Sequence, residues 1–191
     1  MIRLKNQTNV IYDTNIIIYY LFPDGKYRIP LYTRPAKRLT DFLFNQQSVI
    51  IVPHFIINEI ELKGYYNIIN DYFNDIRQSS KLALLNKLKS NFEKLKKHEN
   101  FLEEYYEPSI KLLESISNAF IDFNNLDNID KYFMRKHTDM VNPSVEDKKL
   151  ILFSKEKECP VISNDLDLTF FREKLLNLNL VHEIIDFDSL I

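Results

Sequence analysis

The sequence predicts an α/β fold in which a short parallel sheet of about four strands lies between two layers of helices. Short apolar runs such as residues 49–52 and 161–162 recur along the chain and alternate with longer stretches of helical periodicity. Strands that are apolar throughout are typical of parallel sheets covered on both faces. Between residues 64 and 141 the apolar residues recur at helical spacing, which predicts a largely helical insertion within one domain spanning residues 1–191.

Turn-forming residues separate the predicted elements before the insertion. The first strand ends at Asp13, and the helix after it ends where Pro23-Asp24-Gly25 interrupts the apolar pattern. Pro53, a favourable residue in the first turn of a helix, follows the second strand. The elements predicted here are a strand over residues 10–12, helices over 16–22 and 35–47, a strand over 49–52 and a helix over 53–63.

The segment after the insertion begins at a clear break, Asn142-Pro143-Ser144. A helix over residues 144–157, a strand over 161–162, a helix over 166–176 and a last strand within 181–187 complete the predicted order. Inside the insertion, two apolar stripes at helical spacing, in residues 82–95 and 110–120, predict helices and no strand.

Composition excludes several classes of protein. The 191 residues include 25 basic and 27 acidic side chains, so any surface that binds nucleic acid must be local. Cys159 is the only cysteine, which excludes an intrachain disulfide and a multi-cysteine metal cluster. Gly25 and Gly64 are the only glycines, too few for a P-loop or a dinucleotide fingerprint. The N-terminus lacks a signal-type apolar run, and residues 10–22 are too few to span a bilayer, so we expect a soluble, cytoplasmic protein without a membrane partner.

Acidic residues stand where predicted strands end. Asp13 directly follows the first strand, Glu59 lies one to two turns into the helix after the second, and Asp147 opens the helix before the third. Asp165 and Asp167 follow the third strand. Because ligands of parallel sheets bind at the carboxyl ends of the strands, these side chains are predicted to gather at one edge. Carboxylate oxygens suit Mg²⁺ or Mn²⁺, which can activate water and shield a phosphodiester.

Each acid also has a purely structural interpretation. Asp13 and Asp165 stand at helix N-cap positions, and Ser144 with Asp147 resembles a capping box. Glu59 alone is typical of a solvated helix residue. If each acid had only a structural role, their common position at one sheet edge would be a coincidence. We therefore favour a shared site.

Four segments, in order, resemble the motifs of the PIN-domain nucleases. They are V-I-Y-D-T-N around Asp13, V-P-H-F-I-I-N-E ending at Glu59, D-K-K-L-I-L starting at Asp147, and P-V-I-S-N-D-L-D-L around Asp165. The resemblance implies a PIN-like fold and an endoribonuclease that uses Mg²⁺ or Mn²⁺ to cut single-stranded or structured RNA. It implies that Asp13, Glu59, Asp147 and Asp165 are catalytic metal ligands, with Asp167 a fifth, and that Thr14, Asn15, Ser163 and Asn164 support them.

The chain departs from this family pattern in two places. Compact toxin-type (VapC-like) members have much less chain than residues 64–141 between the second and third motifs, so a toxin–antitoxin role is left open. Lys148 and Lys149 follow Asp147 where the family often has small residues.

The insertion carries the clearest local basic patch. Lys87, Lys89, Lys94, Lys96 and Lys97 lie opposite an apolar stripe and could bind phosphates of an RNA substrate, although a solvated outer face has the same pattern. The helical insertion could also bind an antitoxin or another protein, and a homodimer through helical surfaces would be ordinary. The four histidines share no ligand spacing.

Two other functions fit parts of the pattern. A phosphatase of the haloacid-dehalogenase type also has an Asp after its first strand, but it needs a second Asp two positions later, where this chain has Asn15. A non-catalytic interaction module on the same fold is the other alternative, because fold does not fix function.

Overall fold

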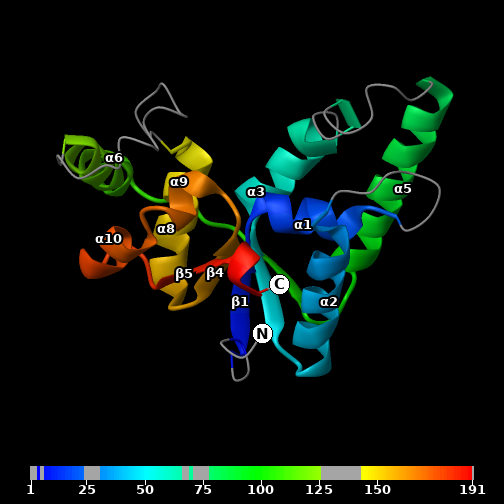
Figure 1. Cartoon of the computed structure of the whole chain (residues 1–191), viewed down its shortest axis with the longest axis horizontal. Helices are drawn as coiled ribbons and strands as arrows, with labels where there is room; N and C mark the ends of the chain where they lie inside the picture. The colour runs from blue at the N-terminus through cyan, green and yellow to red at the C-terminus, as the bar shows by residue number, and fades with distance from the viewer. Residues whose placement is uncertain are drawn as a thin grey trace.

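The computed structural model describes residues 4, 7–23, 31–65, 69–70, 78–125 and 143–190. Its five strands are all parallel and lie in the order β3-β2-β1-β4-β5. Helices cover both faces, so the predicted α/β class with three layers is confirmed (Figure 1). The strands are β1 (Asn9–Tyr12), β2 (Val49–Pro53), β3 (Phe101–Glu104), β4 (Pro160–Ser163) and β5 (Glu183–Asp186).

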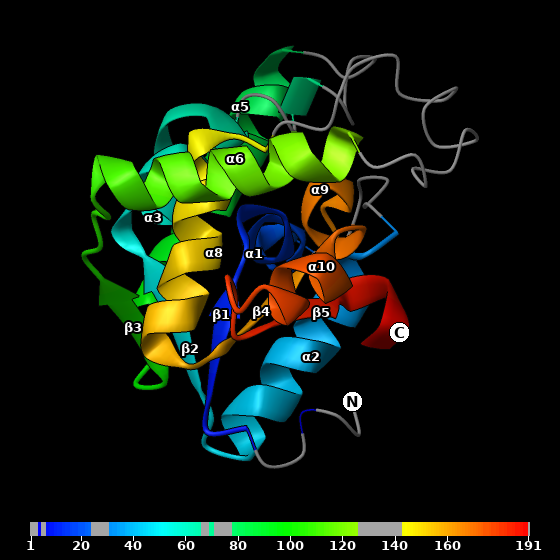
Figure 2. The same ribbon diagram turned by 90° about the vertical axis from the view of Figure 1, so that its left-hand side faces the viewer.

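The described helices divide between the two faces of the sheet. Helices α1 (Thr14–Leu21), α2 (Thr33–Asn45) and α5 (Gln78–Lys96) lie on one side, and α6 (Ile110–Asn125), α8 (Val145–Lys157) and α10 (Arg172–Asn177) lie on the other (Figure 1). Figure 2 shows α8 and α10 in front of the sheet, with α6 crossing above them. The shorter elements are α3 (His54–Glu59), the π-helical turn η2 (Ile60–Gly64), α9 (Leu166–Thr169) and the 3₁₀ turn η3 (Phe187–Leu190).

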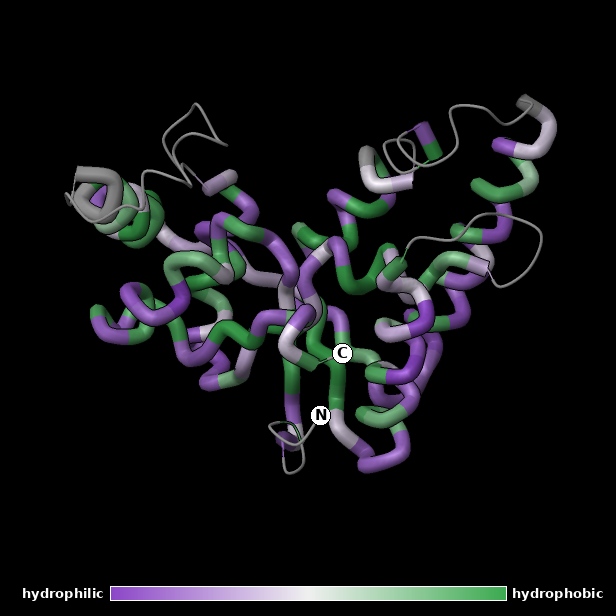
Figure 3. Tube along the Cα trace, viewed as in Figure 1, coloured by the Kyte–Doolittle hydropathy of each residue, from purple (hydrophilic) through white to green (hydrophobic). Residues whose placement is uncertain are grey.

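Successive side chains of the central strands pack into two separate hydrophobic cores, one on each face of the sheet. Val10 and Tyr12 of β1 pack in the cluster that contains α1, α2 and α5, whereas Ile11 between them packs in the cluster that contains α6 and α8. Successive side chains of a strand point to opposite faces, so a central strand must be apolar at every position. Figure 3 shows this as hydrophobic colour along the strands at the centre of the molecule.

The register of the central strands places their carboxyl ends side by side. Ile11 pairs with Val161, and Tyr12 pairs with Ile162. The backbone N–H of Asp13 extends this pairing by donating to the Ile162 carbonyl at 3.2 Å. The residues after β1 and β4 therefore emerge together at one sheet edge.

The prediction that the insertion contains no strand is wrong. Strand β3 lies within residues 64–141 and pairs in parallel with β2, from Ile50 with Phe101 to Pro53 with Glu104. It is an edge strand in which only Phe101 is buried, so its sequence F-L-E-E lacks the apolar run by which the central strands were recognised. The sheet has five strands for this reason, where we expected about four.

The remaining boundaries differ by small amounts. The helix predicted over 166–176 is two helices, α9 and α10, because the chain leaves helical geometry at Phe171. Residues 66–68, 71–77 and 126–141 of the insertion lie outside the described residues, and the assignment of residues 1–191 to a single domain stays a prediction. Among the helices that the structure describes, none has both the length and the apolar composition needed to cross a bilayer.

Truncation of a central strand residue tests this packing. Ile11 is fully buried between β2 and β4, so Ile11→Ala is expected to lower the free energy of unfolding by about 2–5 kcal/mol in urea titrations. Leu178→Ala is the control, because Leu178 is 55% exposed, and we expect a change within about 0.5 kcal/mol. Equal effects of the two substitutions would contradict the assignment of Ile11 to the core.

Candidate functional site

Asp13 forms the centre of the candidate site. Its carboxylate is buried, with 5% of the residue exposed, at the point where β1 ends and α1 begins. Three donors hold it: the Thr14 N–H at 2.6 Å, the Asn15 side-chain amide at 3.1 Å and the Ser163 hydroxyl at 2.5 Å. Thr14 and Asn15 lie in the first turn of α1, and Ser163 ends β4, so the carboxylate joins two strands and a helix.

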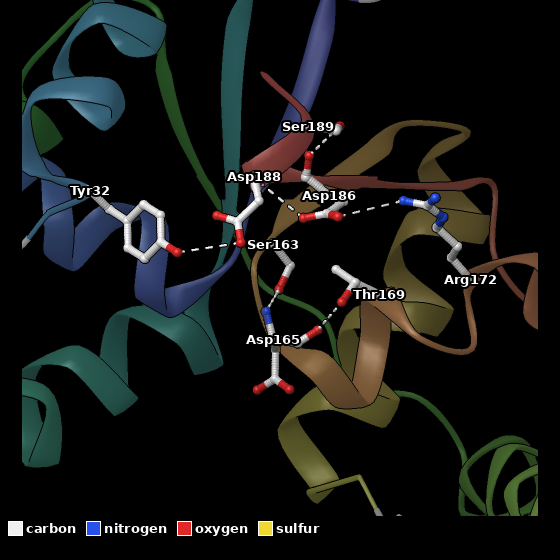
Figure 4. Close-up of polar contacts among 8 residues, drawn as sticks. All are labelled: Tyr32, Ser163, Asp165, Thr169, Arg172, Asp186, Asp188 and Ser189. Carbon is white, nitrogen blue, oxygen red and sulfur yellow. Dashed lines mark hydrogen bonds and ion pairs between the residues drawn. The ribbon is translucent and has the colours of Figure 1, made fainter. Parts of the chain in front are cut away.

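Ser163 links Asp13 to Asp165. The Ser163 oxygen donates to Asp13 and accepts a hydrogen bond from the Asp165 N–H at 2.9 Å. The Asp165 carboxylate caps α9 by accepting from the Asp167 N–H at 2.8 Å. Figure 4 shows that the Asp165 carboxylate points away from Asp186 and Asp188 at the end of β5. One hydroxyl thus joins the Asp13 carboxylate to the backbone of Asp165.

Glu59 reaches the same edge from α3. The Thr14 hydroxyl donates to the Glu59 carboxylate at 2.5 Å, although the two residues are 45 positions apart. Since Thr14 also donates its N–H to Asp13, it bridges the carboxylates of Asp13 and Glu59.

Asp147 approaches from α8, which runs antiparallel to the strands and therefore begins at their carboxyl edge. Its carboxylate accepts the N–H of Ser144 at 2.9 Å and the Ser144 hydroxyl at 2.8 Å, in a complete capping box. The structural interpretation of Asp13, Asp147 and Asp165 as helix caps is thus observed. This capping role is compatible with a shared site. The capping residues lie at the N-termini of α1, α8 and α9, and these helices begin at the same edge of the sheet.

The acids interact electrostatically. Burial raises the pKa of Asp13 to about 7, against the lowering effect of the Ser163 hydrogen bond, and the negative charges of Asp147 and Asp165 raise it further. Burial likewise raises the pKa of Asp147 to about 6, Ser144 opposes this shift, and Asp165 and Asp167 add to it. The negative charges of Asp147, Asp165 and Asp167 therefore lie close enough to act on Asp13 or on one another.

The donor set fits a hard divalent cation in chemistry. Carboxylates of Asp13, Glu59, Asp147, Asp165 and Asp167 could hold Mg²⁺ or Mn²⁺, and the side-chain oxygen of Asn15 is buried without a hydrogen-bond partner among the described residues. Within the same residues, however, no three His, Cys, Asp or Glu side chains stand together in a group that could hold a metal ion. Thr14 donates to Glu59, and Ser144 donates to Asp147. We expect Glu59 or Asp147 to rotate away from its donor when an ion binds.

Sequence reasoning missed a second polar group at the end of β5. Asp186 accepts from the Asp188 N–H at 3.0 Å and lies 3.8 Å from the guanidinium of Arg172, and the Tyr32 hydroxyl donates to Asp188 at 3.3 Å (Figure 4). The signal was available, because Asp186 and Asp188 follow the apolar residues Ile184 and Ile185 of the predicted last strand.

A second missed contact joins His54, after β2, to Glu103 of β3. It could not be predicted from the sequence, because it depends on the unrecognised edge strand.

The basic patch predicted on the insertion lies on α5, which packs against α1 and β3. Lys96 is engaged there in ion pairs with Glu61 at 2.9 Å and Glu93 at 2.6 Å. The other four lysines, Lys87, Lys89, Lys94 and Lys97, are exposed. The role of this surface in binding RNA stays a prediction.

Comparison with known proteins adds no assignment: no protein-family model matches the chain, and no curated protein matches it.

The raised pKa of Asp13 predicts how stability depends on pH when divalent ions are removed by EDTA. The folded state holds the Asp13 proton up to about pH 7, whereas the unfolded chain releases it near the ordinary value of 3.8, so stability falls as the pH rises between these values. Asp13→Asn removes this titration. In urea titrations the free energy of unfolding of the wild type should fall between about pH 5 and about pH 8. We expect this fall to be smaller by about 2–3 kcal/mol in Asp13→Asn.

The matched control is Asp188→Asn, because Asp188 is an exposed acid in η3, directly after β5. It should leave the pH dependence of the wild type unchanged within about 0.5 kcal/mol. If Asp13→Asn and Asp188→Asn give the same pH profile, Asp13 is not desolvated as described.

Proposed function

We propose that this protein is a Mg²⁺- or Mn²⁺-dependent endoribonuclease of the PIN type. The observation that carries the proposal is the convergence of acidic residues from separate segments on buried Asp13. Ser163 and Thr14 connect Asp13 to Asp165 and Glu59 by hydrogen bonds, and the charge of Asp147 acts on Asp13. A cluster of carboxylates that raise one another's pKa is stabilised by a bound cation.

The chain's own residues have distinct roles in this proposal. A bound Mg²⁺ or Mn²⁺ would lower the pKa of a water molecule and shield the charge of the phosphodiester. Asp13, Glu59, Asp147 and Asp165 would hold the ion, with Asp167 as a fifth ligand. Ser163 and Asn15 orient the Asp13 carboxylate, and Thr14 orients Asp13 and Glu59 together. No protein nucleophile is required.

The choice of RNA as substrate rests on the resemblance to the PIN family. Single-stranded or structured RNA is the form we propose, on the same resemblance. The cytoplasm is the proposed compartment because a chain with Cys159 as its only cysteine suits a reducing environment. The exposed lysines of α5 supply cationic surface on the same molecule.

One observation favours a second candidate function. Among the described residues no ready-made group of three metal ligands is present, and Glu59 and Asp147 are engaged with Thr14 and Ser144. A PIN-like interaction module without catalysis would keep these contacts as they are. The two candidates differ in a measurable property, which is the affinity for divalent ions.

Metal-dependent cleavage is the direct test of the first candidate. With a labelled single-stranded RNA and Mn²⁺, we expect Asp13→Asn and Asp165→Asn each to lower the cleavage rate by about 100-fold or more. Ser163→Ala removes a donor that orients Asp13, and we expect a loss of about 10–100-fold. Asp186→Asn is the control, because this acid lies at the same sheet edge and is paired with Arg172; its rate should stay within about threefold of the wild type. Unchanged cleavage by Asp13→Asn would reject the mechanism.

Thermal unfolding separates the two candidates without any assay of activity. If the acids bind Mn²⁺, saturating ion should raise the Tm of the wild type by about 5–10 °C, and Asp13→Asn should abolish this rise. Asp186→Asn should keep it. Equal Tm values with Mn²⁺ and with EDTA would favour the interaction module.

A further inference from the structure

A polar pocket of about 230 Å³ lies between three helices and apart from the carboxylates. It is lined by Tyr20 of α1, Lys37 and Asp41 of α2, and Asn91 and Lys94 of α5. Helix α1 packs against both α2 and α5, which lie on the same side of the sheet in Figure 1. Tyr20 stands near the end of α1, whereas Asp13 caps its start, so the pocket is about 10 Å along the helix from the carboxylates.

The charges that line the pocket are of both signs. Lys37 and Lys94 contribute two ammonium groups from two different helices, and Asp41 contributes one carboxylate. Neither Lys94 nor Asp41 has an ion-pair or hydrogen-bond partner within the part of the chain that the structure describes. Lys94 is therefore available to an anionic group of a ligand, and Asp41 is available to a hydrogen-bond donor.

The two polar residues at the pocket add hydrogen-bonding groups. Asn91 donates its amide N–H to the Leu21 carbonyl at 2.7 Å, which fixes the side chain and leaves its oxygen as an acceptor. Burial and the neighbouring charge of Asp41 raise the pKa of Tyr20, so its hydroxyl keeps its proton and remains a donor. Tyr20 also offers a partly buried aromatic ring.

This combination discriminates between kinds of ligand. A bare phosphate would be attracted by the lysines and repelled by Asp41. A simple cation would be attracted by Asp41 and repelled by the lysines. A ligand with a phosphate at one end and N–H or O–H donors at the other matches both signs. Nucleotides have this pattern, since the base and ribose supply donors and an aromatic side chain can stack on the base. A volume of about 230 Å³ admits one nucleotide rather than several.

We propose that this pocket binds a single nucleotide, with Lys94 at its phosphate and Asp41 accepting a hydrogen bond from its base or ribose. The nucleotide is either a free mononucleotide or one residue of an RNA strand. The inference goes beyond the proposed nuclease activity, because it requires neither the carboxylates around Asp13 nor a metal ion.

Calorimetry with guanosine 5′-monophosphate in EDTA tests the proposal on the wild-type protein. We expect binding, and we expect Lys94→Ala to raise the Kd by about tenfold. Lys89→Ala is the matched control, because Lys89 is exposed on the same helix and does not line the pocket; its Kd should stay within about twofold. Thermal unfolding of each variant checks that the fold is kept.

Asp41→Asn distinguishes a nucleotide from a simple anion. If Asp41 accepts from the base or ribose, the variant should bind guanosine 5′-monophosphate several-fold more weakly and inorganic phosphate more tightly. Competition by a short single-stranded oligoribonucleotide assigns the site to a strand, and failure to compete assigns it to a free mononucleotide; the proposal holds in both cases.

Three results would overturn the inference. They are no binding of guanosine 5′-monophosphate at concentrations on the order of 10 mM, equal affinity of wild type and Lys94→Ala, and tighter binding of both ligands by Asp41→Asn. Because EDTA removes divalent ions, none of these results depends on whether the protein is a nuclease.

Discussion

The hydrogen bond from Ser163 to the buried Asp13 carboxylate is the contact on which the geometry of the sheet edge depends. It joins the ends of β1 and β4, and the same serine oxygen accepts the N–H of Asp165. A carboxylate that is removed from water is costly unless donors surround it, and here Thr14, Asn15 and Ser163 provide them. The donors reduce this cost without cancelling it, because burial still raises the Asp13 pKa to about 7. A bound cation would stabilise the ionised carboxylate, which is the physical reason for proposing one.

The central part of the fold could be predicted because its strands are buried on both faces. Strands β1, β2 and β4 consist of apolar residues that fill both cores, and such runs are visible in a sequence. Strand β3 could not be found in this way, since three of its four residues are not buried and its pairing with β2 depends on the backbone. The position of a strand at the edge of a sheet is determined by tertiary contacts that leave little trace in local composition.

The candidate site was predictable to a similar extent. Residues at strand ends, such as Asp13 and Asp165, follow from the rule that carboxyl ends of parallel strands share an edge. The link between Thr14 and Glu59 spans 45 positions and depends on how α1 and α3 are oriented, which no local pattern specifies. The same limit applies to the pocket between α1, α2 and α5, because its lining comes from three helices whose packing the sequence does not encode in any single segment.

Anomalous diffraction from crystals soaked in Mn²⁺ tests the central claim most directly. We expect one or two Mn²⁺ ions within about 2.1 Å of an Asp13 carboxylate oxygen and of an oxygen from Glu59, Asp147 or Asp165. Glu59 or Asp147 is expected to have rotated from Thr14 or Ser144 toward the ion. Mn²⁺ bound elsewhere on the protein, with none at Asp13, would contradict the claim that this sheet edge is a metal site.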